Sequence, residues 1–565
     1  MANPTIGYRN LQRKLKRWIF PVVLCLIFLA QCAWFVRTQS LTYDEPVDIA
    51  GGLEAWRDHR FELYNDHTPL ARLLVSLPLL DQRWQIDLQT SSTVGWRVSR
   101  ISPDPESLAE RARAMNVFCG LILAFVLWAT ARRLFSESAA NVALALYVFS
   151  PTVIANFSVA TTDGAVTVLI FACAAQLLRW RARPSWERTI AMGVLLGLML
   201  LAKFSAPVMF VLAILWMLVL KPQGLAFNPV RWNWTKVAAA LAIAFFVVWA
   251  GYFFHVSRLT VHDQVLTVSF PHRANVVYKP VHNRMNFSIL VPAGEYLEGF
   301  RTVVRHNRHG MPAYLFGEAS KTGGWRSYYP AVMLLKWPVI TLLLFAASLL
   351  LLLLGKIPAP RGIWVVASFP AVYLGFAIFS HFDMGDRHIL PVYIFVLLFA
   401  GSIWEAIRPN PVLVLVAILA ISLQAADIMR YAPDYISYFN VFVPADDSYK
   451  LLSDSSLDWG QGLLALRRYE RQHPDEKIWL AYFGSIEPQV YGIRARPLGE
   501  GERVEGTLVV SSSNLAGQFL DDPSSYRWVL RYPRVEVLNH SLQVFRVPAK
   551  FTVNTTPNRW HEWAR

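Results

Sequence analysis

Three acidic side chains follow the first long apolar stretch of the chain in close succession. Asp44, Glu45 and Asp48 come directly after the apolar run 18–37. A carboxylate held at a lipid boundary can have a raised pKa, which suits a general base that removes a proton from a hydroxyl. Acidic residues also suit the first turn of an ordinary solvated helix. The spacing alone therefore leaves a catalytic and a structural interpretation open.

Further ionisable side chains stand at the ends of later apolar runs. Asp163 begins one run, Lys203 interrupts a long one, and Arg387 with His388 precedes another. Cations at that depth suit the phosphate group of a lipid. The alternatives are structural, because Asp163 can cap a helix and Lys203 can extend towards lipid headgroups in general. Asp163 and Arg387 avoid the middle of the runs, and the run with Lys203 is long enough for two spans that meet there. The pattern therefore favours a reaction at the membrane surface over a transport path near the midplane.

The elements that must position these residues are hydrophobic helices. The 565 residues are 54% apolar and 16% charged, whereas soluble domains carry roughly 25% charged residues. A helix needs roughly 20 apolar residues to cross a bilayer. We therefore predict a multi-span α-helical membrane protein with about eleven transmembrane helices. The predicted spans lie near residues 18–37, 114–131, 139–157, 162–178, 189–203, 204–220, 237–256, 328–354, 362–380, 388–404 and 411–428.

Basic residues gather in short loops on one predicted side of these spans. They lie in the N-terminal tail, at Arg132 and Arg133, around 179–188 and 221–236, at Lys356 with Arg361, and at Arg408. Short cytoplasmic loops are rich in Lys and Arg, so we expect a cytoplasmic N-terminus and a helical hairpin that turns at Lys203. Much of the net charge of +15 then serves to orient the helices in the membrane. Scattered basic residues also argue against a nucleic-acid surface, which needs one basic stripe or patch.

Three segments outside the spans fall on the opposite, extracytoplasmic side. They are a first loop with interfacial helices (38–113), a second loop (257–327) and a C-terminal region (429–565). The C-terminal region has short apolar runs at 478–483, 507–511 and 542–547, which predict strands of a small α/β domain. We thus predict a transmembrane domain, 1–428, that includes both loops, and a C-terminal extracytoplasmic α/β domain, 429–565.

The order of these motifs resembles the polyprenyl-phosphate-sugar-dependent GT-C glycosyltransferases. The nearest relatives by resemblance are bacterial protein O-mannosyltransferases, with lipid A aminoarabinose transferases more distant. The most specific stretch is Tyr435 to Asn440 followed by Asp454 to Gln461, similar to a Tyr-Phe-Asn and Asp-Ser-Asn-Leu-Asp-Trp-Gly-Gln signature. The other matching segments are 44–46, 67–70, 162–163, 203–205, 317–329 and 385–391.

The resemblance implies an inverting glycosyltransferase of the bacterial cytoplasmic (inner) membrane. An acceptor hydroxyl would attack the anomeric carbon of a sugar on polyprenyl phosphate, undecaprenyl phosphate in bacteria, and the lipid phosphate would leave. The acceptor would be a hydroxyl-bearing protein, lipid or glycan of the cell envelope. The implied roles are Asp44 with Glu45 as the base, Lys203, Arg387 and His388 as phosphate ligands, and Asp163 and His67 as groups that position donor or acceptor.

Some features depart from that family or leave alternatives open. Asp48 stands where the family commonly has His, Thr68 replaces the first Pro of His-Pro-Pro-Leu, and Ser456 replaces Asn. These changes leave the sugar, the acceptor and metal dependence undetermined, and no zinc-motif spacing or cofactor loop occurs. The alternative functions are a lipid or polysaccharide transporter and a membrane scaffold. Asp454, Asp458 and Trp459 are expected to brace the C-terminal domain against the site.

Overall fold

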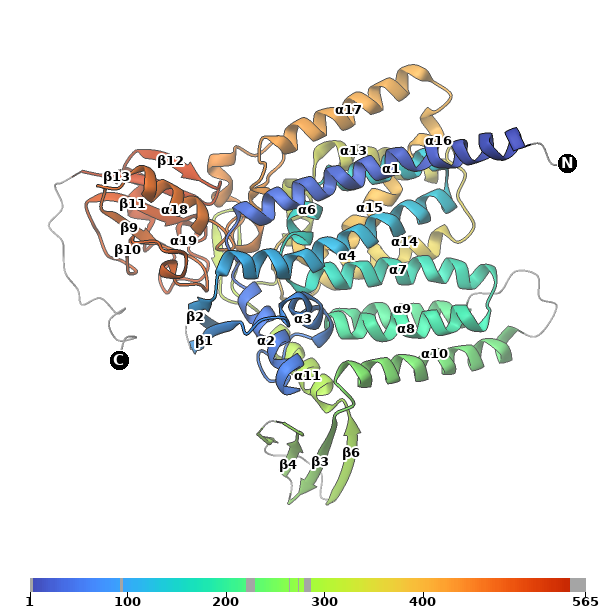
Figure 1. Ribbon diagram of the computed structural model, residues 1–565, viewed down its shortest axis with the longest axis horizontal. Helices are drawn as coiled ribbons and strands as arrows, with labels where there is room; N and C mark the ends of the chain where they lie inside the picture. Colours follow the sequence, from blue (N-terminus) through green and yellow to red (C-terminus); the bar gives the residue numbers. More distant parts are fainter. Residues whose placement is uncertain are drawn as a thin grey trace.

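A computed structural model describes residues 4–91, 95–219, 229–263, 265–272, 274–278 and 286–548. Long helices run side by side and form a bundle, with the described N-terminal end at one extremity (Figure 1). The C-terminal sheet and the loop elements gather at the other extremity, called the site end below. Parts of the predicted loops and domains, including Lys221 and residues 549–565, lie outside the described residues.

The bundle contains all eleven predicted apolar runs as helices, but fewer of them are long enough to cross a membrane. Among the described residues, six helices are long and apolar enough to cross a membrane, or up to eight if each of two bent pairs counts as one span. The predicted count of about eleven is therefore not confirmed. The helices are α1 (Pro4–Thr38), α4 (Pro105–Leu134), α5 (Glu137–Val148), α6 (Pro151–Phe157), α7 (Thr162–Ala182), α8 (Trp186–Ala202), α9 (Ala206–Val219), α10 (Pro229–Gly251), α12 (Tyr328–Lys336), α13 (Val339–Leu353), α14 (Ile363–Ile378), α15 (Leu390–Gly401), α16 (Trp404–Ile407) and α17 (Pro411–Met429).

Two of the predicted spans are broken by proline. Helices α5 and α6 meet at 66°, and α12 and α13 at 113°. Pro151 and Pro338 stand at these breaks, where a proline lacks the N–H that would continue the helical ladder. Helices α8, α9 and α14 have 17, 14 and 16 residues. Helices α9 and α14 are apolar and differ from the full spans in length.

Helix α15 forms the centre of the bundle. All twelve of its residues are buried, and it packs against α5, α7, α13 and α14. A helix that is apolar on every side is stable only when it is surrounded. This central position fixes the preceding 3-10 turn η2 (Asp386–Ile389) at the site end of the bundle.

The first loop contains two short helices and an unpredicted hairpin. Helices α2 (Glu45–Asp58) and α3 (Pro69–Ser76) pack together and are followed by η1 (Leu77–Leu79), while β1 (Gln85–Ser91) pairs antiparallel with β2 (Gly95–Ser102). A Cβ on Gly52 would lie 2.2 Å from the Arg72 carbonyl oxygen. Glycine at that position is therefore what allows α2 and α3 to approach so closely.

The second loop is mostly β-structure, which the sequence did not indicate. A four-stranded sheet has the order β5-β4-β3-β6, and α11 (Gly294–His309) packs against β3. The strands are β3 (Val256–His262), β4 (Val265–Ser269), β5 (Val276–Tyr278) and β6 (Phe287–Pro292), followed by the pair β7 (Ala313–Leu315) and β8 (Glu318–Ser320). Figure 1 shows this sheet projecting sideways beyond α10 at the site end.

The C-terminal region forms a five-stranded mixed sheet of order β10-β9-β11-β13-β12. The three predicted strands correspond to β9, β11 and β13. The division of the chain at residue 428 stays a prediction. The elements are η3 (Tyr435–Ser437), η4 (Ala445–Lys450), η5 (Asp454–Ser456), α18 (Leu463–Gln472), β9 (Ile478–Ala481), η6 (Pro488–Tyr491), β10 (Arg496–Pro497), β11 (Gly506–Ser511), α19 (Ser512–Ala516), η7 (Arg527–Arg531), β12 (Arg534–Leu538) and β13 (Leu542–Val547).

Backbone hydrogen bonds join this C-terminal region to the start of the first loop. The N–H of Ser40 donates to the carbonyl of Gln461 at 3.1 Å, and the N–H of Tyr43 donates to the carbonyl of Trp459 at 2.9 Å. The Ser485 hydroxyl also donates to the carbonyl of Tyr43. The residues just before Asp44 are thus held by a segment more than 400 positions later in the chain.

Candidate active site

Four of the predicted site residues meet at the site end and form a polar cluster: Asp44, Asp163, Lys203 and Arg387. Arg387 Nη1 donates to Asp44 Oδ2 at 2.7 Å and lies 3.9 Å from Asp163 Oδ2. Lys203 Nζ donates to Asp163 Oδ1 at 2.5 Å. The four side chains are between 3% and 16% exposed, so the cluster is shielded but reachable from outside.

Each member of the polar cluster stands at the end of a different element. Asp44 precedes α2 and Asp163 lies in the first turn of α7. Lys203 follows the last residue of α8, and Arg387 belongs to η2. Because apolar helices end where polar side chains can leave the hydrocarbon region, helix ends bring charged groups together at one level.

The turn η5 and the segment that follows it hold Arg387 in place. Its Nε donates to Ser455 Oγ at 3.1 Å, and its guanidinium carbon lies 4.2 Å from the centre of the Trp459 ring. Planar stacking and directed hydrogen bonds fix an arginine more tightly than a lysine. The predicted bracing role of this segment thus has a direct geometric basis in its contacts with Arg387.

Asp454 is a third carboxylate near Arg387. Burial raises its pKa to about 6; the Arg387 charge opposes the rise and the nearby Asp44 adds to it. At neutral pH this group is close to its titration range, so the charge around Arg387 changes with pH. The sequence analysis assigned Asp454 only a bracing role.

The turn 383–388 positions Arg387 and His388. Gly385 has φ of +76°, and a Cβ there would lie 2.5 Å from Ser456 Oγ, so only glycine fits. Asp386 accepts a hydrogen bond from the Thr152 hydroxyl at 2.9 Å. The His388 ring is buried, and neither nitrogen has a hydrogen-bond partner among the described residues. A buried imidazole without a partner is available to a ligand.

Glu45, predicted to position or share the role of Asp44, lies outside the hydrogen bonds of the polar cluster. Its carboxylate accepts two hydrogen bonds from Arg113, both at 2.8 Å. Two backbone N–H groups, of Thr42 and Ala160, donate to it at 2.7 Å. Both Glu45 and Arg113 are fully buried. With its oxygens occupied in this way, Glu45 is suited to hold three segments of the chain together.

His67 lies beside Asp48, outside the hydrogen bonds of the polar cluster. His67 Nδ1 lies 2.7 Å from Asp48 Oδ1, and Arg72 Nε donates to the same oxygen at 3.0 Å. Burial alone would lower the pKa of His67, but the Asp48 carboxylate outweighs it and the pKa is raised. Burial would likewise raise the pKa of Asp48, but His67 and Arg72 together lower it. The pair is therefore stabilised in its charged form.

The sequence analysis missed two buried arginines at this end, Arg72 and Arg113. Both pair with carboxylates of the Asp44–Asp48 motif. The sequence does carry one sign that these arginines are buried. Each is a charged residue next to apolar residues that the fold buries. Within the described ranges, no group of three or more His, Cys, Asp or Glu side chains is arranged to hold a metal ion.

One comparison with known families gives a match. Residues 106–252 match the model of a family described as dolichyl-phosphate-mannose-protein mannosyltransferase. The matched segment is about a quarter of the chain and contains Arg113, Asp163 and Lys203. It confirms, over this segment, the resemblance to the polyprenyl-phosphate-sugar-dependent glycosyltransferases. No curated protein matches the chain.

Two solved structures are similar to the chain at low identity. ArnT from Cupriavidus metallidurans bound to undecaprenyl phosphate is 12% identical, with 94% of this chain and 98% of that chain covered and a TM-score of 0.46. AglB from Archaeoglobus fulgidus with an inhibitory peptide and a dolichol-phosphate is 11% identical, with 96% and 75% covered and a TM-score of 0.44. Similarity at this level does not establish a shared activity.

Proposed function

We propose that the protein is a glycosyltransferase that moves a sugar, with inversion, from a polyprenyl-phosphate donor to a hydroxyl acceptor. The reaction takes place on the extracytoplasmic face of the membrane. The observation that carries the proposal is the bridge that Arg387 makes between Asp44 and Asp163, with Lys203 on the far side of Asp163. A potential base and two cations therefore share one site.

The proposed roles follow from how charge moves in such a transfer. The acceptor oxygen forms a bond to the anomeric carbon, and the bond from that carbon to the phosphate oxygen breaks. The acceptor proton passes to Asp44, which is 14% exposed and can be reached. The leaving phosphate gains one negative charge, which Arg387, Lys203 and the unpartnered His388 stabilise.

Arg387 links the two halves of this charge transfer. Before the reaction it faces the Asp44 carboxylate at 2.7 Å. When Asp44 takes up the proton it becomes neutral, while the phosphate becomes more negative. The cation then keeps an anionic partner throughout, because the negative charge it faces moves from the base to the leaving group. Such preorganised electrostatics require little rearrangement during the step.

The placement of the charges supports a reaction at the membrane surface more than a transport path. Asp163, Lys203 and Arg387 stand at helix ends. Each carboxylate of the cluster contacts a cation of the same cluster: Asp163 contacts Lys203, and Asp44 contacts Arg387. A transporter would be expected to place such groups on broken helices at the midplane.

The test uses purified protein, polyprenyl-phosphate sugars carrying a radiolabel, and a cell-envelope fraction as the acceptor. Asp44→Asn is expected to lower kcat by roughly 100- to 10,000-fold, the usual contribution of a general base. Lys203→Ala is expected to lower transfer as well. The exposed pair Asp447 and Lys450, 2.9 Å apart, supplies the matched controls Asp447→Asn and Lys450→Ala, which should transfer at the parent rate. Parent-like transfer by Asp44→Asn would remove the proposed base.

A further inference from the structure

The β3–β6 sheet of the second loop leaves the bundle directly after a helix that is long and apolar enough to cross a membrane. The apolar segment of α10 ends at Gly251, and β3 begins at Val256. Figure 1 shows the sheet projecting sideways from this end of α10, with its edge strand β6 on the side towards the transmembrane helices. The sheet therefore starts close to the level at which hydrocarbon gives way to lipid headgroups.

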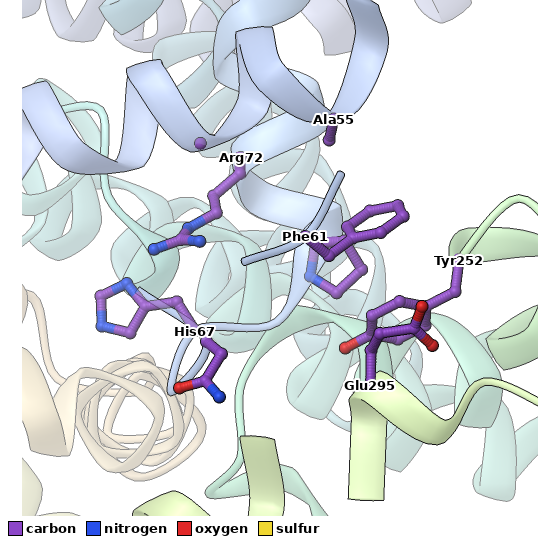
Figure 2. A pocket seen from close by; sticks show the side chains of 9 residues that line it. Ala55, Phe61, His67, Arg72, Tyr252 and Glu295 are labelled. Carbon is purple, nitrogen blue, oxygen red and sulfur yellow. The ribbon is translucent and has the colours of Figure 1, made fainter. Parts of the chain in front are cut away.

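Both ends of the sheet are fixed to the rest of the site end. Tyr252 precedes the first strand and Glu295 follows the last; Figure 2 shows the two on one side of a narrow pocket, opposite Arg72 of the first loop. His255 Nδ1 lies 2.8 Å from Glu295 Oε1, and the N–H of Ala293 donates to the His255 carbonyl at 3.0 Å. These contacts fix the direction in which the sheet leaves α10.

The two faces of the sheet have different surroundings. Arg258 of β3 pairs with Leu290 of β6, and Val256 stands two residues before Arg258, so the three side chains share one face. Ser257 lies on the opposite face and is fully buried, and its hydroxyl oxygen would lie 2.5 Å from a Cβ on Gly294, the first residue of α11. Helix α11 therefore covers the Ser257 face, whereas Val256, Arg258 and Leu290 are exposed.

The exposed face continues the apolar outer surface of α10. The Phe246 ring on α10 lies 5.5 Å from the ring of Phe254 in the turn before β3. Val256 and Leu290 extend this surface onto the sheet, and all four side chains, called the apolar strip below, are more than a third exposed. Because lipid chains cover the outer surface of a membrane-spanning helix, a strip that continues from it is suited to lipid as well.

The turn that presents Phe254 has an unusual backbone. Phe253 and Phe254 have φ of +50° and +60°, a region that bulky side chains seldom adopt. The N–H of Phe254 donates to the Trp249 carbonyl at 3.0 Å, and Trp249 Nε1 donates to the His255 carbonyl at 2.9 Å. The turn thus holds the Phe254 ring on the outside of the protein beside α10. Burial of that ring among lipid chains offsets a backbone cost that exposure to water would leave uncompensated.

Arg258 favours a lipid surface over a second protein as the occupant. It is exposed and is the cross-strand neighbour of Leu290. An arginine can lay its methylene groups along an apolar surface while its guanidinium binds lipid phosphates. A second copy of the chain packed twofold through the same strip would instead bury two Arg258 side chains together, and no residue of the apolar strip is acidic.

We propose that the face of the sheet with Val256, Arg258 and Leu290 docks onto the membrane surface. Phe254 and Leu290 enter the lipid layer at the boundary between chains and headgroups, and Arg258 binds lipid phosphates. The sheet is then an interfacial anchor beside the transmembrane bundle, and not a freely solvated loop. The proposal concerns contact with lipid and does not rest on sugar transfer.

The test uses the purified chain in nanodiscs of phosphatidylcholine with phosphatidylglycerol. Leu290→Cys is labelled with the fluorophore NBD in a Cys25→Ala background, because Cys25 is half-buried and the other three cysteines are buried. A nitroxide on the lipid acyl chain quenches a label among the chains, and iodide quenches a label in water. Val535→Cys, at a position 53% exposed on β12 of the C-terminal sheet, is the matched control. We expect nitroxide lipid to quench the label at position 290 at least about twofold more than the control label, and iodide to give the opposite order.

A second comparison tests the phosphate contact. With the label at position 290, Arg258→Glu is expected to reduce nitroxide quenching by roughly half in nanodiscs that contain phosphatidylglycerol. Arg531→Glu, at another exposed arginine, should leave the quenching unchanged, and equal effects of the two variants would overturn the role of Arg258.

Two results would overturn the docking onto lipid. Iodide quenching at position 290 equal to that of the control would show a solvated face. Protection of the label from both quenchers would show that a protein or a second copy covers it. None of these measurements depends on sugar transfer, so the proposed function stands or falls separately.

Discussion

Glu45→Gln should destabilise the fold far more than Asp44→Asn, although the two residues are adjacent. Glu45 pairs with Arg113, and both side chains are 0% exposed. Glutamine keeps one acceptor oxygen, but its NH₂ group would face a donor where the second carboxylate oxygen now accepts from Arg113 and a backbone N–H. Leaving one buried charge without its partner costs about 3–5 kcal/mol.

Asp44 gives the matched comparison. Its carboxylate accepts a hydrogen bond from Arg387, and both side chains are more than 10% exposed. Asp163 is a second anion near that arginine. Asp44→Asn should therefore cost about 1–2 kcal/mol of stability. It should nevertheless abolish most of the sugar transfer.

Thermal unfolding of the purified protein, followed by tryptophan fluorescence, measures this contrast. We expect the Tm of Glu45→Gln to fall by about 5–10 °C and that of Asp44→Asn by a few degrees at most. The double variant Glu45→Gln/Arg113→Met should recover part of the loss, because it also removes the unpaired charge. Equal Tm values for the two single variants would refute the assignment of Glu45 as a structural anchor.

The remaining predictions concern pH and packing. Burial raises the pKa of Asp454 to about 6, so its ionised form adds negative charge near Arg387 as pH rises from 5 to 7. Because a lipid phosphate also titrates near pH 6, the comparison is between proteins: the affinity of the parent for polyprenyl phosphate, measured by fluorescence and divided by that of Asp454→Asn, should fall over this range. A pH dependence identical to the parent's would contradict this role. The pKa of His67 is raised in the folded state. Its contribution to stability is therefore fully present below pH of about 6.5 and is lost as pH rises through the folded pKa. The Tm difference between parent and His67→Gln should be larger at pH 5 than at pH 9, and the opposite order would refute the pairing with Asp48. Gly52→Ala should lower Tm markedly, since the new methyl group would meet the α3 backbone at 2.2 Å, whereas Gly375→Ala, with no atom within 4 Å, should leave Tm within about 2 °C of the parent.

The sequence predicts the helices and the residue types of the polar cluster for a physical reason. Long apolar runs have few stable alternatives to helices in a bilayer, and charged residues at their ends are costly unless they are used. Asp163, Lys203 and Arg387 therefore stood out against their surroundings before any fold was known. The structure adds that these particular ends lie within 4 Å of one another.

Other parts of the site depend on contacts between distant residues that local patterns do not carry. Glu45 and Arg113 are 68 positions apart, and Asp48 and Arg72 are 24 apart. Nothing near Glu45 distinguishes it from Asp44, so both were predicted as the base. The strands β3 to β6 and the hairpin β1–β2 lie in segments of mixed polarity between long hydrophobic runs. Their pairing is set by tertiary context, which strand propensity reflects only weakly.

The backbone hydrogen bond between Tyr43 and Trp459 has a consequence for how the protein is assembled during synthesis. Asp44 leaves the ribosome early, but the residues that clamp its neighbour and stack on Arg387 follow about 415 positions later. At 5–20 residues per second this interval lasts roughly 20–80 s. During it the polar cluster lacks the residues that hold Tyr43 and Arg387. On the proposed function, a chain terminated before Trp459 is therefore expected to transfer no sugar.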